Sequence, residues 1–181
     1  MNDDLESLAG TETAVWKTLE NGVREPTSPA RTIALATEAL TGGGAVRMVV
    51  LRAVDRETKR LTFYTHRASS KVAELDSNPQ AEALVWDADR QFQVRLTGKV
   101  EIQDGPREIW DKFGPGTRRN YAAEPLPATP LSDPGEMEPT PDPHAFTVLT
   151  LHVETFETLW LTKDVQRRAR FTNGGAEWIA P

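Results

Sequence analysis

Short strand-like segments dominate the first two thirds of this chain and constrain its fold more than any other feature. They occupy residues 31–39, 46–54, 61–65, 81–86 and 91–102, separated mostly by short turns that are polar or rich in glycine. In several of them apolar and polar residues alternate with a period of two, as in strands that bury one face. Strands at this spacing predict an antiparallel barrel or sandwich, and no βαβ alternation favours a doubly wound sheet.

Helical patterns are fewer and shorter. Residues 11–21 carry apolar side chains on one face, and we expect Thr11 to be the N-cap and Gly22 to end the helix. Further short helices are expected over 69–79 and 107–113.

The chain of 181 residues is expected to form a single domain over 1–181, with residues 1–10 frayed. Residues 114–143 contain eight of the 13 prolines and little periodicity, which is typical of a functional loop or of a disordered linker. Three more strands are expected after this segment, at 145–153, 156–162 and 176–179, with the basic segment 163–171 between the last two.

Composition excludes several classes of chemistry. The absence of cysteine excludes disulfides, thiolate metal ligands and thiol catalysis. His66, His144 and His152 have no metal-like spacing, so we expect no metal site. A net charge of −6 argues against nucleic-acid binding. No apolar run approaches the roughly 20 residues of a membrane span, and the acidic N-terminus does not resemble a signal peptide, so we expect a cytoplasmic protein with no membrane contact.

Two basic groups are candidates for binding an anion. Arg47 and Arg52 are five residues apart on one strand, which places them on opposite faces unless the strand bulges or ends between them. Ser70 and Lys71 begin a helix soon after a strand end, where free backbone N–H groups attract phosphate. A charge-assisted hydrogen bond contributes about 1.5–3 kcal/mol, whereas micromolar binding needs about 8 kcal/mol. Arg47 would therefore have to converge on the same phosphate.

Polar and aromatic residues further along could contact a planar ligand. The amide of Gln93 can both donate to and accept from an imide edge. Trp160 could cover a ring, and Arg170, ten residues later, could stabilise negative charge on it. Taken singly, each candidate has a plainer interpretation: an ordinary helix cap, a polar residue on a wet strand face, or a core tryptophan beside a solvated basic turn.

Taken in order, these motifs resemble the pyridoxamine 5′-phosphate oxidase family, whose members are FMN-binding split-barrel flavoproteins. The resemblance runs from about Arg31 to Pro181, with gaps in 114–143. It is carried by RMVVLR, FYT, SSK followed by ELDSNP, QFQVRLTGKVE, ETLWL, RAR and the closing WIAP.

The resemblance implies a mainly β, antiparallel, Greek-key-like split barrel and a homodimer with FMN at the interface, where Gln93 reaches the cofactor of the partner subunit. It implies that FMN contacts Arg47, Met48, Val49, Val50, Tyr64, Thr65, Ser70, Lys71, Gln93, Trp160 and Arg170, and that a small-molecule substrate contacts Arg52 and Arg168. No catalytic residue is assigned.

The chain departs from the family pattern at positions that bear on the reaction. Arg52 stands where the family has a lysine, and Ser70 where it more often has an arginine. Gln166 and Arg168 stand where the family has an Arg-x-His pair. The resemblance therefore implies FMN binding more strongly than oxidation of pyridoxamine phosphate.

Two functions of different class follow. The first is an FMN-dependent oxidoreductase that acts on pyridoxine or pyridoxamine phosphate or on another small molecule. The alternative is a flavin-free barrel that binds a ligand or partner through 114–143, with an anion or peptide contact at Arg118 and Arg119. Single-strand nucleic-acid binding on an OB-like barrel is disfavoured by the net charge of −6.

Overall fold

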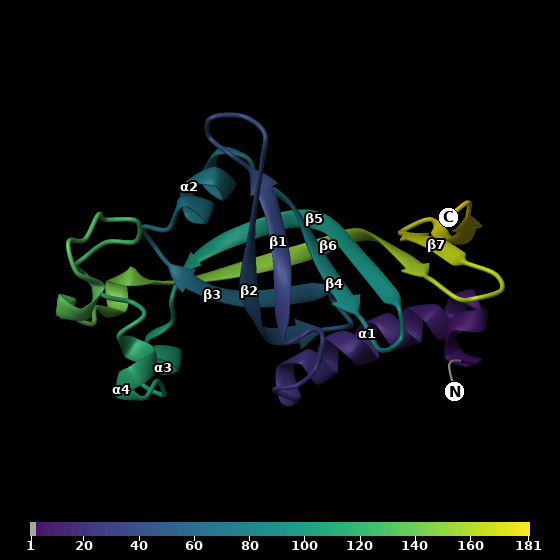
Figure 1. Ribbon diagram of the computed structural model, residues 1–181, viewed down its shortest axis with the longest axis horizontal. Helices are drawn as coiled ribbons and strands as arrows, with labels where there is room; N and C mark the ends of the chain where they lie inside the picture. The colour runs from purple at the N-terminus through teal and green to yellow at the C-terminus, as the bar shows by residue number, and fades with distance from the viewer. Residues whose placement is uncertain (1–2) are drawn as a thin grey trace.

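The computed structural model describes residues 3–181 and has a mainly β architecture (Figure 1). The strands are β1 (Thr32–Glu38), β2 (Gly44–Asp55), β3 (Arg60–His66), β4 (Gln80–Asp87), β5 (Phe92–Asp104), β6 (Phe146–Trp160), β7 (Arg167–Thr172) and β8 (Gly175–Ile179). They form one antiparallel sheet in the order β3-β2-β1-β4-β5-β6-β7-β8. An additional β3–β6 pairing closes the first six strands of this order into a barrel.

The strand order confirms the predicted fold class. β1 to β4 lie in the spatial order 3-2-1-4, which is the Greek-key arrangement. β7 and β8 continue the sheet beyond the closed barrel as a hairpin on β6. Alternate residues of each barrel strand point inward, so Leu35, Leu51, Phe63 and Leu96 are fully buried in a common core.

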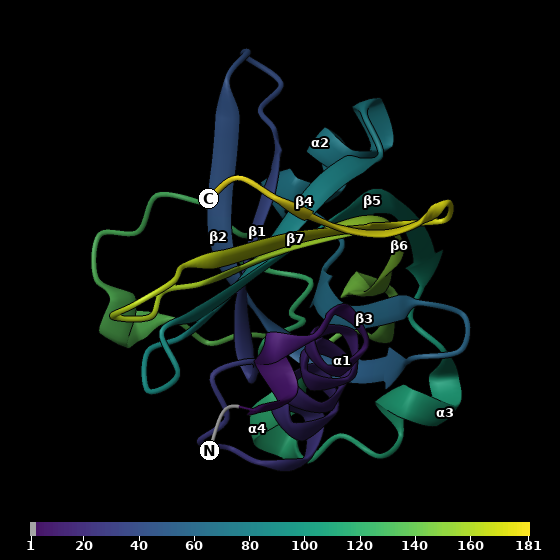
Figure 2. The same ribbon diagram turned by 90° about the vertical axis from the view of Figure 1, so that its right-hand side faces the viewer.

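Two helices lie on opposite sides of the strands in both views (Figures 1 and 2). Helix α1 (Leu8–Arg24) buries Trp16 and Leu19 in the barrel core, and α2 (Ser70–Ser77) contacts β1 and β5. No helix within residues 3–181 has the length and apolar character required to cross a lipid bilayer.

The expected ends of the first helix were wrong. A 3-10 turn, η1 (Asp3–Glu6), precedes α1, and Leu5 is only 1% exposed, so the described part of 1–10 is packed rather than frayed. Ser7, not Thr11, is the N-cap and accepts from the N–H of Gly10. Gly22 lies inside the helix, where a Cβ atom would come within 2.5 Å of a neighbouring backbone oxygen. Gly22 therefore allows close packing instead of ending the helix.

The two strands expected at 145–153 and 156–162 are one continuous strand, β6. It pairs with β5 on both sides of a register shift between Thr97 and Gly98. A Cβ atom on Gly98 would lie 1.9 Å from the carbonyl oxygen of His152, so only glycine fits at this irregularity. Pairing with β5 thus keeps β6 continuous, although the local sequence pattern predicts two strands there.

The segment 107–143 has little regular structure. Helix α3 (Arg107–Trp110) is a single turn, shorter than the expected helix over 107–113, and it is followed by α4 (Pro115–Arg118), η2 (Pro134–Glu136) and η3 (Pro143–Ala145). Trp110 and Tyr121 pack with Phe146 in a second apolar cluster outside the barrel core. This cluster anchors both ends of the Pro-rich segment, residues 114–143, to β6.

Candidate functional site

Arg47 lies at one end of the barrel, beside the N-terminal half of α2. Its Nη2 atom is 2.5 Å from Oε2 of Glu74, and its Nη1 atom donates to Oγ1 of Thr37. Glu74 is a glutamate only 6% exposed, and Thr37 donates to the same oxygen at 2.6 Å. Burial acts to raise the pKa of Glu74, but hydrogen bonds from Thr37 and Arg47 outweigh burial and lower it. The pair therefore holds Arg47 in one orientation.

Lys71 adds a second positive charge next to Arg47. Its Nζ atom donates to Oγ1 of Thr65 at 3.1 Å, and that hydroxyl is 3.1 Å from Oγ of Ser69. Burial lowers the pKa of Lys71, and the nearby charge of Arg47 lowers it further. Ser69 is the N-cap residue of α2, but its side chain makes no capping hydrogen bond. Its hydroxyl therefore points to Thr65 instead.

We call Arg47, Thr65, Ser69, Ser70 and Lys71 the cationic cradle. Two cations with mutual repulsion face a single carboxylate, so the cradle keeps a net positive charge. The first N–H groups of α2 have no partner within the helix, and they lie beside these side chains. Charge, hydroxyl groups and helix N-terminus together fit a phosphate group.

Arg52 lies apart from the cradle. The register of β2 against β3 shifts between Leu51 and Ala53, so the strand bulges at Arg52. Its guanidinium carbon is 5.6 Å from the ring centroid of Tyr64, and its Nε atom is buried without a hydrogen-bond partner. Burial raises the pKa of Tyr64, and the charge of Arg52 partly offsets this. Arg47 and Arg52 thus lie on the same strand but have different partners, Glu74 for Arg47 and the ring of Tyr64 for Arg52.

Four further predicted residues lie on β5 to β7, and their recorded partners are not residues of the cradle: Gln93, Trp160, Arg168 and Arg170. Gln93 on β5 pairs with Leu159 on β6. Arg168 and Arg170 donate hydrogen bonds to Glu157 at 2.7 and 3.0 Å. The bond from Arg168 has the largest effect on the pKa of Glu157, and both bonds lower that pKa. Figure 1 shows β7 at one end of the molecule, well away from α2.

Trp160, at the end of β6, packs partly against the barrel core, with the guanidinium of Arg167 5.4 Å from its ring centroid. The single chain therefore brings together the residues predicted for the phosphate, but not Gln93, Trp160 or Arg170 with them.

An apolar strip crosses the outer face of β2, β1 and β4. Ala34 on β1 is paired with Met48 on one side and with Leu84 on the other, so the strip is continuous. Met48 is 61% exposed, and Val46 and Trp86 are 68% and 42% exposed. Val49 differs from the other predicted residues of RMVV because its side chain is buried in the barrel core, whereas Val50 is half-buried.

Sequence reasoning missed three residues at the cradle. Thr37 lies on a strand that carries no motif, and its role follows from the pairing of β1 with β2. Glu74 lies one helical turn after Ser70, and this spacing was the only sequence signal for it. Ser69 was considered only as a helix cap.

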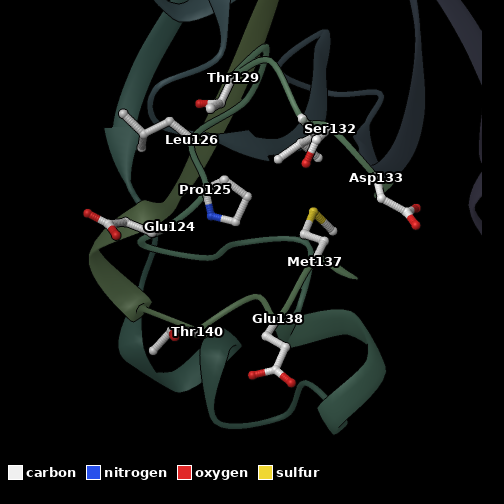
Figure 3. Close-up of a pocket in the computed structure, with 10 residues that line it drawn as sticks. Glu124, Pro125, Leu126, Thr129, Ser132, Asp133, Met137, Glu138 and Thr140 are labelled. Atoms are coloured by element: carbon white, nitrogen blue, oxygen red, sulfur yellow. The ribbon is translucent and has the colours of Figure 1, made fainter. Parts of the chain in front are cut away.

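A separate hollow of about 650 Å³ lies within the Pro-rich segment (Figure 3). Leu126, Met137 and Ser132 line it, together with acidic residues such as Glu138. None of the residues predicted to bind FMN contributes to this hollow. Within residues 3–181, no group of three or more His, Asp or Glu side chains is arranged to hold a metal ion.

The barrel carries at its rim a cationic cradle that fits a phosphate, and comparison with known families places the chain in a class of FMN-binding proteins. Residues 13–104 match the family model described as "Pyridoxamine 5′-phosphate oxidase, FMN-binding domain". The chain belongs to this family, and its cofactor is FMN. The matched residues include the whole cradle, Arg52 and Gln93, but not Trp160, Arg168 or Arg170.

Curated relatives share this region. A pyridoxine/pyridoxamine 5′-phosphate oxidase of Deinococcus deserti is 34% identical over 123 residues, which cover 66% of this chain and 54% of the relative. A protein of the same name from Trichormus variabilis is 40% identical over 67 residues, covering 37% of this chain and 30% of the relative. The chain thus spans about half, or less, of the curated relatives that it matches.

Solved structures share the fold over nearly the whole chain. A pyridoxamine 5′-phosphate oxidase-related, FMN-binding protein of Nostoc punctiforme has a TM-score of 0.77 at 24% identity, covering 97% of this chain and 100% of that one. PhzG of Burkholderia lata, in complex with tetrahydrophenazine-1-carboxylic acid, has a TM-score of 0.74 at 18% identity, covering 100% of this chain and 97% of that one. At these identities the likeness concerns the fold alone.

Proposed function

We propose that this protein is an FMN-dependent oxidoreductase whose cationic cradle holds the phosphate of the cofactor. The observation that carries the proposal is the adjacency of Arg47 and Lys71 at the N-terminus of α2, within the matched FMN-binding domain. A phosphate dianion would relieve the repulsion between these two cations. It would also accept hydrogen bonds from the hydroxyls of Ser69 and Ser70 and from the first N–H groups of the helix.

When bound, the flavin supplies the redox chemistry, and the protein orients it and tunes its electronics. In this proposal Arg47 and Lys71 bind the phosphate, and Thr65 fixes the ammonium group of Lys71 through the hydrogen bond at 3.1 Å. Met48, Val50 and Tyr64, with their partly exposed side chains, would contact the rest of the cofactor. Arg52 would contact a negatively charged group of the substrate, since its Nε atom has no partner.

The site would be completed in a homodimer. In support, the apolar strip around Met48 and Leu84 is exposed on a single protomer, and burial of such a strip favours association. Gln93, Trp160 and Arg170 have their recorded partners on β4 to β8 and not in the cradle of their own chain, and a second copy of the chain would bring them to FMN. Arg170 would then exchange part of its pairing with Glu157 for a contact with the flavin.

The substrate distinguishes two forms of this proposal. The curated relatives are named pyridoxine/pyridoxamine 5′-phosphate oxidases, which favours a phosphorylated vitamin B6 substrate. Gln166 and Arg168 replace the pair that the family carries there, which favours another small molecule. Either form keeps the FMN site described above.

A visible absorption spectrum of the purified protein tests the cofactor. We expect flavin bands, either on purification or after titration with FMN, and a colourless protein that takes up no FMN would refute the proposal. Anaerobic addition of pyridoxamine 5′-phosphate tests the substrate. Bleaching together with pyridoxal 5′-phosphate formation identifies the vitamin oxidase. Bleaching only with a reduced nicotinamide identifies a reductase that acts on another substrate.

A further inference from the structure

His66, the last residue of β3, is only 9% exposed, and both of its ring nitrogens have partners. The Nε2 atom is 2.8 Å from the carbonyl oxygen of Ala122. The backbone N–H of Ala68 donates to the Nδ1 atom at 3.0 Å. Only the neutral ring with its proton on Nε2 satisfies both contacts, because a carbonyl must receive a proton and an N–H must find a lone pair.

The contact with Ala68 lies in the turn that leads into the cationic cradle. The turn from His66 to Ser69 connects β3 to α2, and the N–H of Ser69 donates to the carbonyl of His66 at 3.0 Å. The hydroxyl of Ser69 lies 3.1 Å from that of Thr65, which in turn accepts from Lys71. The bond from Ala68 to the ring therefore helps to fix the turn that aims Ser69 and Lys71.

The other contact belongs to the Pro-rich segment. Ala122 forms an isolated antiparallel bridge with Pro141, and the N–H of Asp142 donates to the carbonyl of Tyr121 at 2.8 Å. These contacts hold the two ends of the loop over 122–141 side by side. The ring of Tyr121 stacks on Phe113, with centroids 5.7 Å apart and an interplanar angle of 17°. His66 therefore holds the base of the loop over 122–141 to the end of β3.

We propose that His66 is a positioning residue that couples phosphate binding at the cradle to the order of the Pro-rich segment. This inference rests on the proposed function, because it takes FMN phosphate as the ligand of the cradle. A ligand that fixes the turn at Ala68 and Ser69 also fixes the orientation of the His66 ring. That orientation determines where the Nε2–H group points, and so whether it can donate to the carbonyl of Ala122. Coupling is reciprocal, so an ordered loop also strengthens FMN binding.

The test measures amide hydrogen exchange of 121–142 without ligand, with saturating FMN and with saturating riboflavin, which lacks the phosphate. We expect FMN to slow exchange in this segment about tenfold and riboflavin to leave it unchanged. In His66→Phe, which keeps a ring but removes both hydrogen bonds, FMN should bind about tenfold more weakly and should no longer protect 121–142. In His66→Gln, whose amide can still donate to Ala122, part of the protection should return.

His152→Phe is the matched control, because His152 lies on β6 and its Nε2 atom contacts only Glu101 among the residues described. Exchange of the barrel amides shows whether each variant is folded. The coupling is refuted if saturating FMN protects 121–142 equally in His66→Phe, or if riboflavin protects the segment as well as FMN does. If the wild-type protein binds no FMN at all, the proposed function fails as well. If FMN binds without any change in 121–142, only the coupling fails.

Discussion

Arg47 and Glu74 form an ion pair of 2.5 Å at the end of the barrel, where Glu74 is almost fully buried and Arg47 is half-buried. The pair connects β2 to α2, and Thr37 on β1 donates to the same carboxylate oxygen. One residue proposed to bind phosphate is therefore already held in place by a carboxylate. This relationship has consequences for both stability and cofactor binding.

Removal of the charge of Glu74 should destabilise the fold. In Glu74→Gln the guanidinium of Arg47 loses its counter-charge in a largely buried place, at a cost of about 1–3 kcal/mol of unfolding free energy. Urea unfolding at pH 7 measures this cost. Glu82→Gln is a control, since its carboxylate pairs with Arg95 on the more exposed outer face. A loss as small as that of the control would contradict a structural role for the buried pair.

The same pair predicts a dependence of stability on pH. The pKa of Glu74 in the folded protein is below its ordinary value of 4.5, so the folded state binds the proton less readily than the unfolded state does. Its contribution is complete above the unfolded pKa and is lost as the pH falls through the folded pKa. The difference in unfolding free energy between wild type and Glu74→Gln should therefore shrink below about pH 4.5. A difference that stays constant down to pH 3 would rule out this linkage.

Lys71→Ala should weaken FMN binding by about 10- to 100-fold, because a charge-assisted hydrogen bond contributes about 1.5–3 kcal/mol. Riboflavin, which has no phosphate, should bind both proteins equally. Fluorescence quenching of the flavin measures both affinities. Lys17→Ala, an exposed lysine on α1, is the control and should leave FMN binding unchanged. Equal losses for FMN and riboflavin would place Lys71 elsewhere than at the phosphate.

Leu84→Glu should separate the proposed homodimer. Leu84 lies within the apolar strip, and a carboxylate there would be desolvated when two strips meet. Sedimentation velocity should show a shift from dimer to monomer, with weaker FMN binding at the same protein concentration. Leu126→Glu adds the same charge at a residue 50% exposed in the Pro-rich segment and should change neither property. A wild-type protein that sediments as a monomer with FMN bound would exclude a shared site.

Gly98→Ala should destabilise the barrel without touching the cradle. The new Cβ atom would lie 1.9 Å from the carbonyl oxygen of His152, so β5 and β6 would have to separate at the register shift. We expect a loss of about 3 kcal/mol, or a fall in Tm of about 10 °C. Gly114→Ala is the control, because a Cβ atom there meets nothing within 4 Å. A thermal scan that shows equal Tm values for both variants would contradict this account.

The local pattern of the chain determined most of the strands and one part of the site. Short apolar or alternating segments separated by turns predicted β1 to β5 to within a few residues, because each strand must present at least one face to the core. Thr65, Ser70 and Lys71 could be grouped from the sequence, because a strand end and a helix start only a few residues apart must lie close together. The identity of the cofactor was predicted from the order of motifs along the chain, through the resemblance to a family that binds FMN.

The rest depended on contacts between residues distant in the sequence. The pairing of β1 with β2 and the packing of α2 brought Glu74 and Thr37 to Arg47, and no local signal predicts that meeting. Pairing with β5 likewise keeps residues 146–160 in one strand, β6, where the local pattern predicted two. Contacts of Leu5 with the core extended the order of the N-terminal region beyond its local helical pattern.

Tertiary structure also decided which predicted residues can act together. It placed Gln93, Trp160 and Arg170 away from the cradle, and it directed the two nitrogens of His66 to two different segments. Local propensity and periodicity indicated β1 to β5, the approximate place of α1 and α2, and the kinds of side chain available, but they divided β6 into two strands and gave no strand at β7. Strand register and helix packing decided which of those side chains meet, because both are set by the burial of the whole core.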